Sequence, residues 1–370
     1  SSDLSLAGQG GSLEFGKSGQ GHWRYSAKLA WRSPGLELND LGYMRSTDLM
    51  HQSTSLGYRY WEELGMFKNF RFNLNQWAGW DFAGTNLYKG AGFNTHSRFT
   101  NFWSFNMGGY ANTEGVNNNI LRGGPAVYMP GNWGAWTNIH SDPRMDFSAS
   151  VGASLSRGDE DVQQNQSLWV RFRYRPVNSL LLSVRPSLNL RNNHMQYVST
   201  ENFLEKNRYV LARISQQSMR MEFRVNYSIS PEFAIQYYGQ PFVASGSYSG
   251  FKYITAPTAA NFNNRYALFS GRQIAYSPEN QEYRVDEDGD GTQDYTFGNN
   301  DFQRMDFMSN LVLRWEYIPG SAFFLVWSQS RNESFGAGQP QKDITASAQV
   351  LGEAEAHNVF MMKLSYRFGT

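Results

Sequence analysis

The chain has 370 residues, of which 16% are aromatic and 18% charged, with a formal net charge of +1 and no cysteine. The lack of cysteine excludes a disulfide framework and a thiolate metal site. The near-zero net charge gives no support for nucleic-acid binding. The mean hydropathy is −0.56, so the chain is polar on average although it is rich in aromatic residues and poor in charge.

Alternation of apolar and polar residues with a period of two predicts strands along the chain. The clearest cases are 23–32, 168–175, 219–227, 310–317 and 360–368. In the last of these, one face carries Phe360, Met362, Leu364, Tyr366 and Phe368, and the other carries Lys363, Ser365 and Arg367. Each of these segments is therefore expected to have one apolar face and one polar face.

The connections between the predicted strands alternate in length. Short turns are expected near 18–20, 64–65, 99–100, 141–144, 176–178, 229–231 and 319–320. Long polar loops are expected at about 33–52, 82–90, 113–133, 157–166, 193–208, 247–302 and 332–356. Outer-membrane barrels have short periplasmic turns and longer outer loops.

The count comes to about fifteen strands, whereas single-chain bacterial barrels have even numbers. Together with a start at Ser1 rather than Met, this predicts a C-terminal part of a longer precursor. A soluble antiparallel sheet with one buried face would also alternate. The aromatic residues at the strand ends and the long cations on the opposite faces favour a barrel with aromatic girdles and a polar lumen. We therefore expect an all-β, transmembrane antiparallel β-barrel forming one domain over residues 1–370, in contact with the lipid of a Gram-negative outer membrane.

The cations on the polar faces allow two interpretations. They are Arg24, Lys28, Arg32, Arg171, Arg173, Arg220, Arg224, Arg314, Lys363 and Arg367. They could form an anion-selective wall. They could equally form internal ion pairs with Glu222 and Glu316 that fill the lumen.

Several stretches resemble an outer-membrane family in the identity of their residues as well as in their polarity pattern. They are 31–40 (WRSPGLELND), 75–77 (NQW), 121–125 (LRGGP), 236–242 (QYYGQPF) and 313–317 (LRWEY). Members of that family carry an N-terminal module similar to the family-nine carbohydrate-binding modules, followed by a C-terminal barrel domain of unknown function. The chain resembles the barrel part. The resemblance implies that the carbohydrate-binding-like module lies upstream of Ser1.

The acidic run 286–294 is the strongest chemical signal. Aspartates at its first, third, fifth and ninth positions and glycine at its sixth match the start of a calcium loop. The predicted metal ligands are Asp286, Asp288, Asp290, Thr292 (through its carbonyl) and Asp294. The bidentate glutamate expected at position twelve is replaced by Phe297, which predicts a weak Ca2+ site with a structural role in an extracellular loop. The competing interpretation is a solvated acidic turn.

Catalytic signatures are missing from the sequence. The six histidines have no ligand-like spacing, and no G-x-S-x-G elbow occurs. The stretch 11–18 matches P-loop spacing, but it lacks the following helix and predicts a strand and hairpin instead. We expect a protein that is not an enzyme.

Two functions from different classes fit these features. The first is a barrel that binds or passes an extracellular polymer, expected to be carbohydrate, or its fragments. The alternative is a structural subunit of a larger complex with other outer-membrane proteins, in which the apolar face is a docking surface. Exposed loop aromatics, namely Tyr128, Trp133, Trp136 and Tyr248, could stack on sugars or pack the loops together.

Overall fold

The computed structural model describes residues 7–38, 44, 46–337 and 344–368. Ser1, Asn39 and Asp40 lie outside the described residues. The chain divides into two compact units. Unit 1 comprises Ser1–Thr137, Leu155–Gln164 and Lys252–Ala267, and unit 2 comprises Asn138–Ser154, Asn165–Phe251 and Leu268–Thr370.

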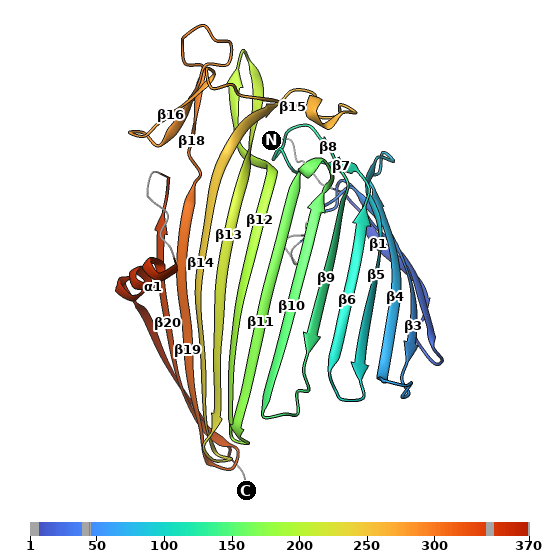
Figure 1. The fold of residues 1–370 in the computed structure, drawn as a ribbon, viewed down its shortest axis with the longest axis vertical. Helices are drawn as coiled ribbons and strands as arrows, with labels where there is room; N and C mark the ends of the chain where they lie inside the picture. The colour runs from blue at the N-terminus through green and yellow to red at the C-terminus, as the bar shows by residue number, and fades with distance from the viewer. Residues whose placement is uncertain (1–6, 39–43, 45, 338–343, 369–370) are drawn as a thin grey trace. The chain divides into compact units, whose positions relative to one another are not determined.

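Unit 1 is built on a run of antiparallel strands that lie side by side in Figure 1. These are β1 (Gly10–Lys17), β2 (Trp23–Arg32), β3 (Leu49–Tyr60), β4 (Phe67–Trp80), β5 (Asn86–Phe99) and β6 (Ser104–Asn112). A separate two-stranded sheet pairs β7 (Gly115–Asn117) with β8 (Val127–Met129). The 3-10 helices η1 (Asp159–Asp161) and η2 (Phe262–Asn264) also belong to this unit. The stretch with P-loop spacing falls mostly in β1, which confirms the predicted strand.

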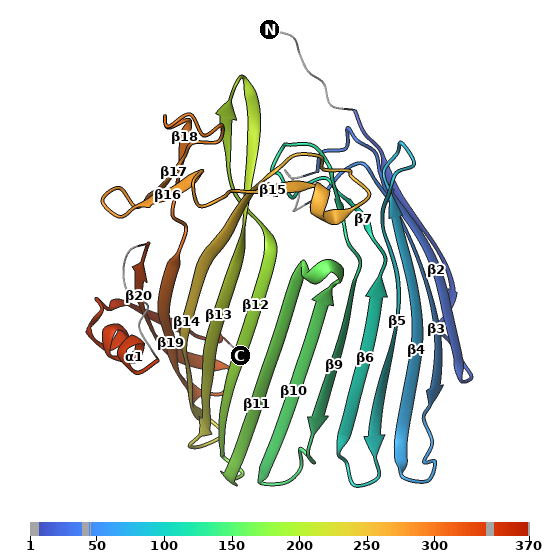
Figure 2. The same ribbon diagram turned by 45° about the horizontal axis from the view of Figure 1, so that its top comes forward.

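Unit 2 contains the longest strands. These are β12 (Leu180–Phe203), β13 (Lys206–Ser228), β14 (Phe233–Ile254), β19 (Phe302–Ile318), β20 (Ser321–Phe335) and β21 (His357–Ser365). A small sheet of β16 (Ile274–Ser277), β17 (Glu282–Val285) and β18 (Tyr295–Gly298) lies next to the tip of the β12–β13 hairpin in Figures 1 and 2. Helix α1 (Ile344–Glu353) precedes β21.

The strand order runs through both units. It is β1-β2-β3-β4-β5-β6-β9-β10-β11-β12-β13-β14-β19-β20-β21, with the short β15 (Tyr266–Leu268) paired to β14. Five strands hold residues of both units, namely β9 (Asn132–His140), β10 (Phe147–Gly158), β11 (Gln163–Val177), β14 and β15. The protein is therefore all-β, with one large antiparallel sheet of 16 strands, fifteen of which follow this path. No pairing between β1 and β21 is present among the described residues, so closure into a barrel stays a prediction. Within the same described residues, no helix is both long and apolar enough to cross a membrane.

Three of the predicted long loops are wrong. The loop expected at 193–208 is instead the paired end of the β12–β13 hairpin, with only two residues between Phe203 and Lys206. The loop expected at 82–90 ends early, because β5 begins at Asn86. The loop expected at 157–166 is a four-residue connection, because β10 ends at Gly158 and β11 begins at Gln163. All three stretches are polar and lose their alternation, which is why the sequence suggested loops. Backbone hydrogen bonds continue a ladder whatever the polarity of the side chains, and in the hairpin the ring of Phe203 contacts Tyr295 of β18.

Successive residues of a strand point to opposite faces, and in unit 1 the register sorts them by polarity. One row across four strands consists of Tyr25, Leu56, Leu74 and Phe93, which are 43, 41, 47 and 39% exposed. A neighbouring row of Trp23, Tyr58 and Phe72 stands nearer the short turns, and a third row of Trp31, Met50 and Trp80 stands nearer the long connections. We call this surface the apolar face.

The opposite, polar face of unit 1 carries hydroxyl and amide side chains. Ser26 and Ser55 hydrogen-bond across β2 and β3 at 2.9 Å, and Asn73 donates to Asn94 across β4 and β5 at 2.6 Å. On one face of these four strands, side chains of neighbouring strands hydrogen-bond to one another. The other face is apolar and exposed.

Unit 2 repeats this division of faces. On β19, β20 and β21 the apolar rows are Leu313, Leu325 and Met362, flanked by Leu311, Trp327 and Phe360 and by Trp315, Phe323 and Leu364. On β12 and β13, Val184 pairs with Phe223 and Leu182 with Val225. The strands expected at 168–175, 219–227, 310–317 and 360–368 fall on β11, β13, β19 and β21, although β21 ends at Ser365.

The loops of unit 1 are fastened by a buried arginine. Arg265 is 2% exposed and donates hydrogen bonds to the carbonyls of Ala259 (2.7 Å), Ala260 (3.0 Å) and Tyr128 (2.7 Å). Its guanidinium also lies against the rings of Tyr128 and Phe262. A buried cation without a carboxylate partner is tolerated when its donors are satisfied in this way, so Arg265 holds the segment around β8 to the segment 252–267.

Replacing Arg265 should release this segment. Arg265→Met leaves three carbonyls without a donor, at roughly 1–3 kcal/mol for each one that stays buried. We expect faster limited proteolysis within 113–131 and a lower melting temperature. Arg272→Met, at an exposed arginine, is the control and should leave both unchanged. Equal behaviour of the two variants would contradict a fastening role for Arg265.

Candidate functional site

The acidic run forms the turn between two strands of the small sheet in unit 2. Residues 286–294 connect β17 to β18, and the ends of the turn are held by the pair Val285–Tyr295 and by a backbone hydrogen bond from Asp294 to Val285 of 2.8 Å. Val285 is fully buried and Tyr295 is 7% exposed. The two ends of the turn are therefore held in place by the sheet.

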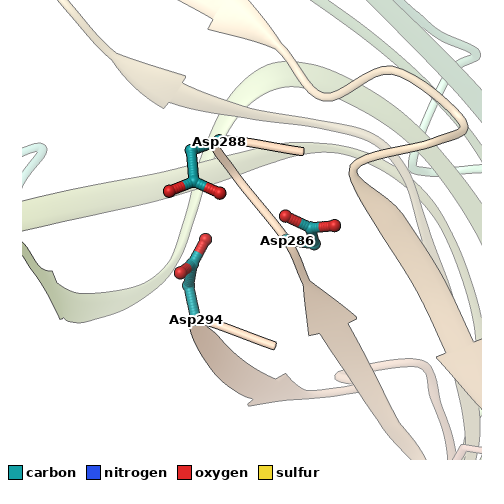
Figure 3. A group of neighbouring side chains, drawn as sticks. All are labelled: Asp286, Asp288 and Asp294. Carbon is teal, nitrogen blue, oxygen red and sulfur yellow. The ribbon is translucent and has the colours of Figure 1, made fainter. Parts of the chain in front are cut away.

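Three of the predicted ligands come together in this turn. Asp286, Asp288 and Asp294 each offer a carboxylate oxygen, and these oxygens all lie within 4.8 Å of one another. Figure 3 shows the carboxylates of Asp288 and Asp294 directed toward each other, with Asp286 beside them. Oxygens that share one Ca2+ at about 2.4 Å can stand at most about 4.8 Å apart, so the spacing fits a common cation.

Backbone amides set the orientation of Asp286. Its carboxylate accepts hydrogen bonds from the N–H groups of Gly289 (2.7 Å), Asp290 (3.1 Å) and Gly291 (2.9 Å). Gly289 and Gly291 have φ values of +77° and +92°, a backbone region that glycine adopts without a steric penalty. The glycines therefore permit the tight turn that brings the aspartates together.

Asp290, a fourth predicted ligand, does not belong to this group. Asp290 accepts hydrogen bonds from the hydroxyl (2.5 Å) and the backbone N–H (2.7 Å) of Thr292. These bonds, the hydroxyl first, lower the pKa of Asp290 below its usual value. Asp290 is thus fully ionised at neutral pH, but its carboxylate is engaged locally. Asp290 and Thr292 as ligands stay a prediction.

A residue that no sequence motif indicates, Glu287, joins the turn to the neighbouring β12–β13 hairpin. Glu287 is bound by the guanidinium of Arg208 on β13 at 2.8 Å, and it accepts the hydroxyl of Tyr295 at 2.6 Å. Its side chain is 6% exposed, so this ion pair is largely removed from water. The alternation of aspartate and glutamate hid this role, because Glu287 looked like one more surface acid. Only the long-range partner Arg208 distinguishes it.

Some of the cations on the polar face of unit 2 form internal ion pairs, which is one of the two interpretations that the sequence allows. Glu222 stands 3.6 Å from Arg220 and 3.8 Å from Arg185, and Arg314 pairs with Glu316 at 2.5 Å. Other cations lie over aromatic rings, with Arg224 on Tyr238 and Lys363 on Phe324. The expected pairs with Glu222 and Glu316 are therefore formed, and an anion-selective wall stays a prediction.

Comparison with known proteins assigns this all-β chain to a family. The family model "Domain of unknown function (DUF5916)" matches residues 2–266, more than half of the chain, so the protein belongs to that family. No curated protein matches it. A solved structure described as a "Bacterial polysaccharide outer membrane secretin" aligns with a TM-score of 0.36 and 9% sequence identity, over 88% of this chain and 87% of that one. Similarity at this level does not establish a common fold or function.

The family match confirms one part of the resemblance seen in the sequence, namely the domain of unknown function. The upstream carbohydrate-binding-like module stays a prediction. So do the single barrel domain over 1–370, the outer-membrane location and the Ca2+ ligand.

The cation hypothesis is tested by proteolysis of the 283–297 segment with and without Ca2+. If Ca2+ binds, chelation should raise the rate of cleavage, because four nearby carboxylates repel one another when uncompensated. Asp288→Asn combined with Asp294→Asn should cleave rapidly even with Ca2+ present.

Asp290→Asn serves as the comparison. It should resemble the wild type if the three-aspartate group is the ligand set, and the double variant if the five-residue set holds. Equal cleavage of the wild type with Ca2+ and with chelator would leave the solvated turn as the correct interpretation.

Proposed function

We propose that this chain is part of an outer-membrane β-barrel that binds or passes an extracellular polymer, expected to be carbohydrate, or its fragments. The observation that carries the proposal is the exposed apolar face. Rows such as Tyr25–Leu56–Leu74–Phe93 in unit 1 and Leu313–Leu325–Met362 in unit 2 run from strand to strand. Soluble monomers rarely expose contiguous apolar patches above a few hundred Å2.

Lipid is the environment that suits these rows best. The aromatic rows on either side of the aliphatic ones match the girdles that barrels place at the two membrane interfaces. The polar face, with its serines, asparagines and paired arginines, matches a wet interior. A lumen lined by hydroxyls and amides is suited to an uncharged, hydroxyl-rich polymer, which exchanges hydrogen bonds with such groups at little cost.

Two neighbouring methionines on β21 provide a matched test. Met362 belongs to the apolar face and is 76% exposed, whereas Met361 points to the opposite face and is 54% exposed. Met362→Arg should sharply reduce the fraction recovered in the outer membrane with heat-modifiable migration, because a cation on the lipid face costs roughly 2–4 kcal/mol near the midplane. Met361→Arg should insert almost normally. Equal recovery of the two variants would contradict the lipid assignment.

A second function is favoured by one specific feature of the apolar face. Gln52, Thr54 and Gln76 form a polar patch on β3 and β4, in which Thr54 pairs with Gln76 and Gln52 donates to Thr54 at 2.7 Å. Amides facing lipid are costly, so this patch is better matched to another protein. A structural subunit of a larger outer-membrane complex would dock there.

The two functions differ in their response at this patch. Gln76→Leu should leave insertion unchanged or improved and the mass of the detergent-solubilised protein unchanged if lipid covers the patch. A fall in mass from a larger assembly to a single chain would support the structural subunit.

A further inference from the structure

A cavity in unit 1 lies where β3, β4, β5 and β6 meet the β7–β8 segment. Its volume is about 790 Å3, within the roughly 300–1,000 Å3 that ligand sites occupy. Its walls come from residues 46–49, 77, 87–88, 112–113, 115–119, 129–130 and 132. None of the predicted site residues belongs to it.

The charge of the walls restricts the ligand. Asp48 is the one carboxylate among the described residues that line the cavity, and it accepts the backbone N–H of Phe82 at 2.8 Å. No lysine or arginine is among the lining residues that the structure describes. Phosphate and carboxylate ligands are recognised by such cations, so these walls favour a neutral ligand over an anion.

Amide side chains dominate the polar part of the walls, and two of them have a defined orientation. The indole Nε1 of Trp77 donates to Oδ1 of Asn112 at 2.9 Å, and Nδ2 of Asn112 donates to Oδ1 of Asn132 at 3.0 Å. Because the indole N–H can only donate, it determines which end of each amide faces the next. This chain of hydrogen bonds from Trp77 through Asn112 to Asn132 therefore leaves the NH2 group of Asn132 as a donor for a ligand.

Three more asparagines stand on the segment that follows β6. Asn117 accepts the N–H groups of Asn119 and Ile120, which holds the turn. Asn118 and Asn119 line the cavity, and within the described part of the chain their side chains form no hydrogen bond. Each can offer a ligand one acceptor and two donors.

The segment bearing these amides is held in place from behind. Leu121 and Val127 are fully buried, and the carbonyl of Tyr128 is held by Arg265 at 2.7 Å. Pre-organised polar groups bind with less loss of conformational entropy than mobile ones. The Tyr88 hydroxyl is likewise fixed, at 2.9 Å from Nδ1 of His51.

We infer that this cavity binds a neutral saccharide segment. Paired amides match vicinal hydroxyls, and the aromatic side chains of Trp77 and Tyr88 supply apolar surface for the C–H face of a sugar ring. The inference deepens the proposed function, because it gives the polymer a site and a chemical class. It rests on that proposal only for the source of the ligand.

The test is calorimetric titration of the full-length purified protein in detergent. The probes are three neutral oligosaccharides, maltohexaose, cellohexaose and xylohexaose, with hexagalacturonate as the charged control. We expect at least one neutral probe to bind and the acidic probe not to. Asn118→Ala with Asn119→Ala should weaken binding at least tenfold.

Two further variants locate the site. Trp77→Phe keeps a ring but removes the donor that orients Asn112 and Asn132, and should weaken binding several-fold. Asn202→Ala, at an exposed asparagine at the tip of the β12–β13 hairpin, should bind like the wild type. Failure of all neutral probes to bind the folded wild type would overturn the inference, as would unchanged binding by the Asn118/Asn119 variant or equal binding of the acidic probe.

Fractionation of the same cells keeps this result separate from the proposed function. Protein that reaches the outer membrane but binds no neutral probe contradicts the cavity assignment alone. Protein that binds but is absent from the outer membrane contradicts the membrane assignment alone.

Discussion

The exposed apolar face is the constraint on which the rest of this structure depends. An antiparallel sheet that is one layer thick has two faces, and each must meet a medium that suits it. On the polar face, side chains bond to one another across strands, as Asn73 and Asn94 do in unit 1 and Arg185 and Glu222 do in unit 2. The apolar rows have no covering layer of helices, since α1 is the one α-helix among the described residues and is ten residues long. Lipid from outside the chain is the medium that we propose for them.

The connections between the strands can differ in conformation because the sheet does not depend on them. Because the strands provide the framework, the segments beyond their ends can take irregular shapes that are fixed by single buried groups. Arg265 does so in unit 1 by satisfying three carbonyls, and Glu287 does so in unit 2 through Arg208 and Tyr295. Both the acidic turn and the amide-lined cavity stand on segments held in this way. Binding groups on loops fastened to a rigid scaffold are the usual arrangement for recognition.

Much of the sheet could be predicted because alternation is a local property of the sequence. Strands such as β2 and β19 were expected from their period-two pattern, and the turns at 18–20 and 319–320 from their glycines. The paired end of the β12–β13 hairpin was missed, because polar side chains around Asn193 hide a ladder made by the backbone. In the acidic turn, spacing alone suggested five ligands, whereas the geometry groups Asp286, Asp288 and Asp294.

The cavity was missed for a different reason. Trp77, Asn112 and Asn132 are brought together by strand register and a return of the chain, and no short motif records that contact. Weak hints were present, since three consecutive asparagines at 117–119 are unusual in a strand-rich chain. A run of amides alone does not reveal that an indole on β4 orients them. Register over many residues is the information that a single sequence lacks.

The central claim, that lipid covers the apolar face, is tested most directly by single-cysteine labelling in intact outer membranes. The chain has no cysteine of its own, so each substitution reports on one position. Leu56→Cys and Leu74→Cys probe the apolar face of β3 and β4, and Ser55→Cys and Asn75→Cys probe the polar face one residue away. The account predicts that a membrane-impermeant maleimide labels the second pair and spares the first until the membrane is dissolved. Rapid labelling of Leu56→Cys and Leu74→Cys in intact membranes would contradict it.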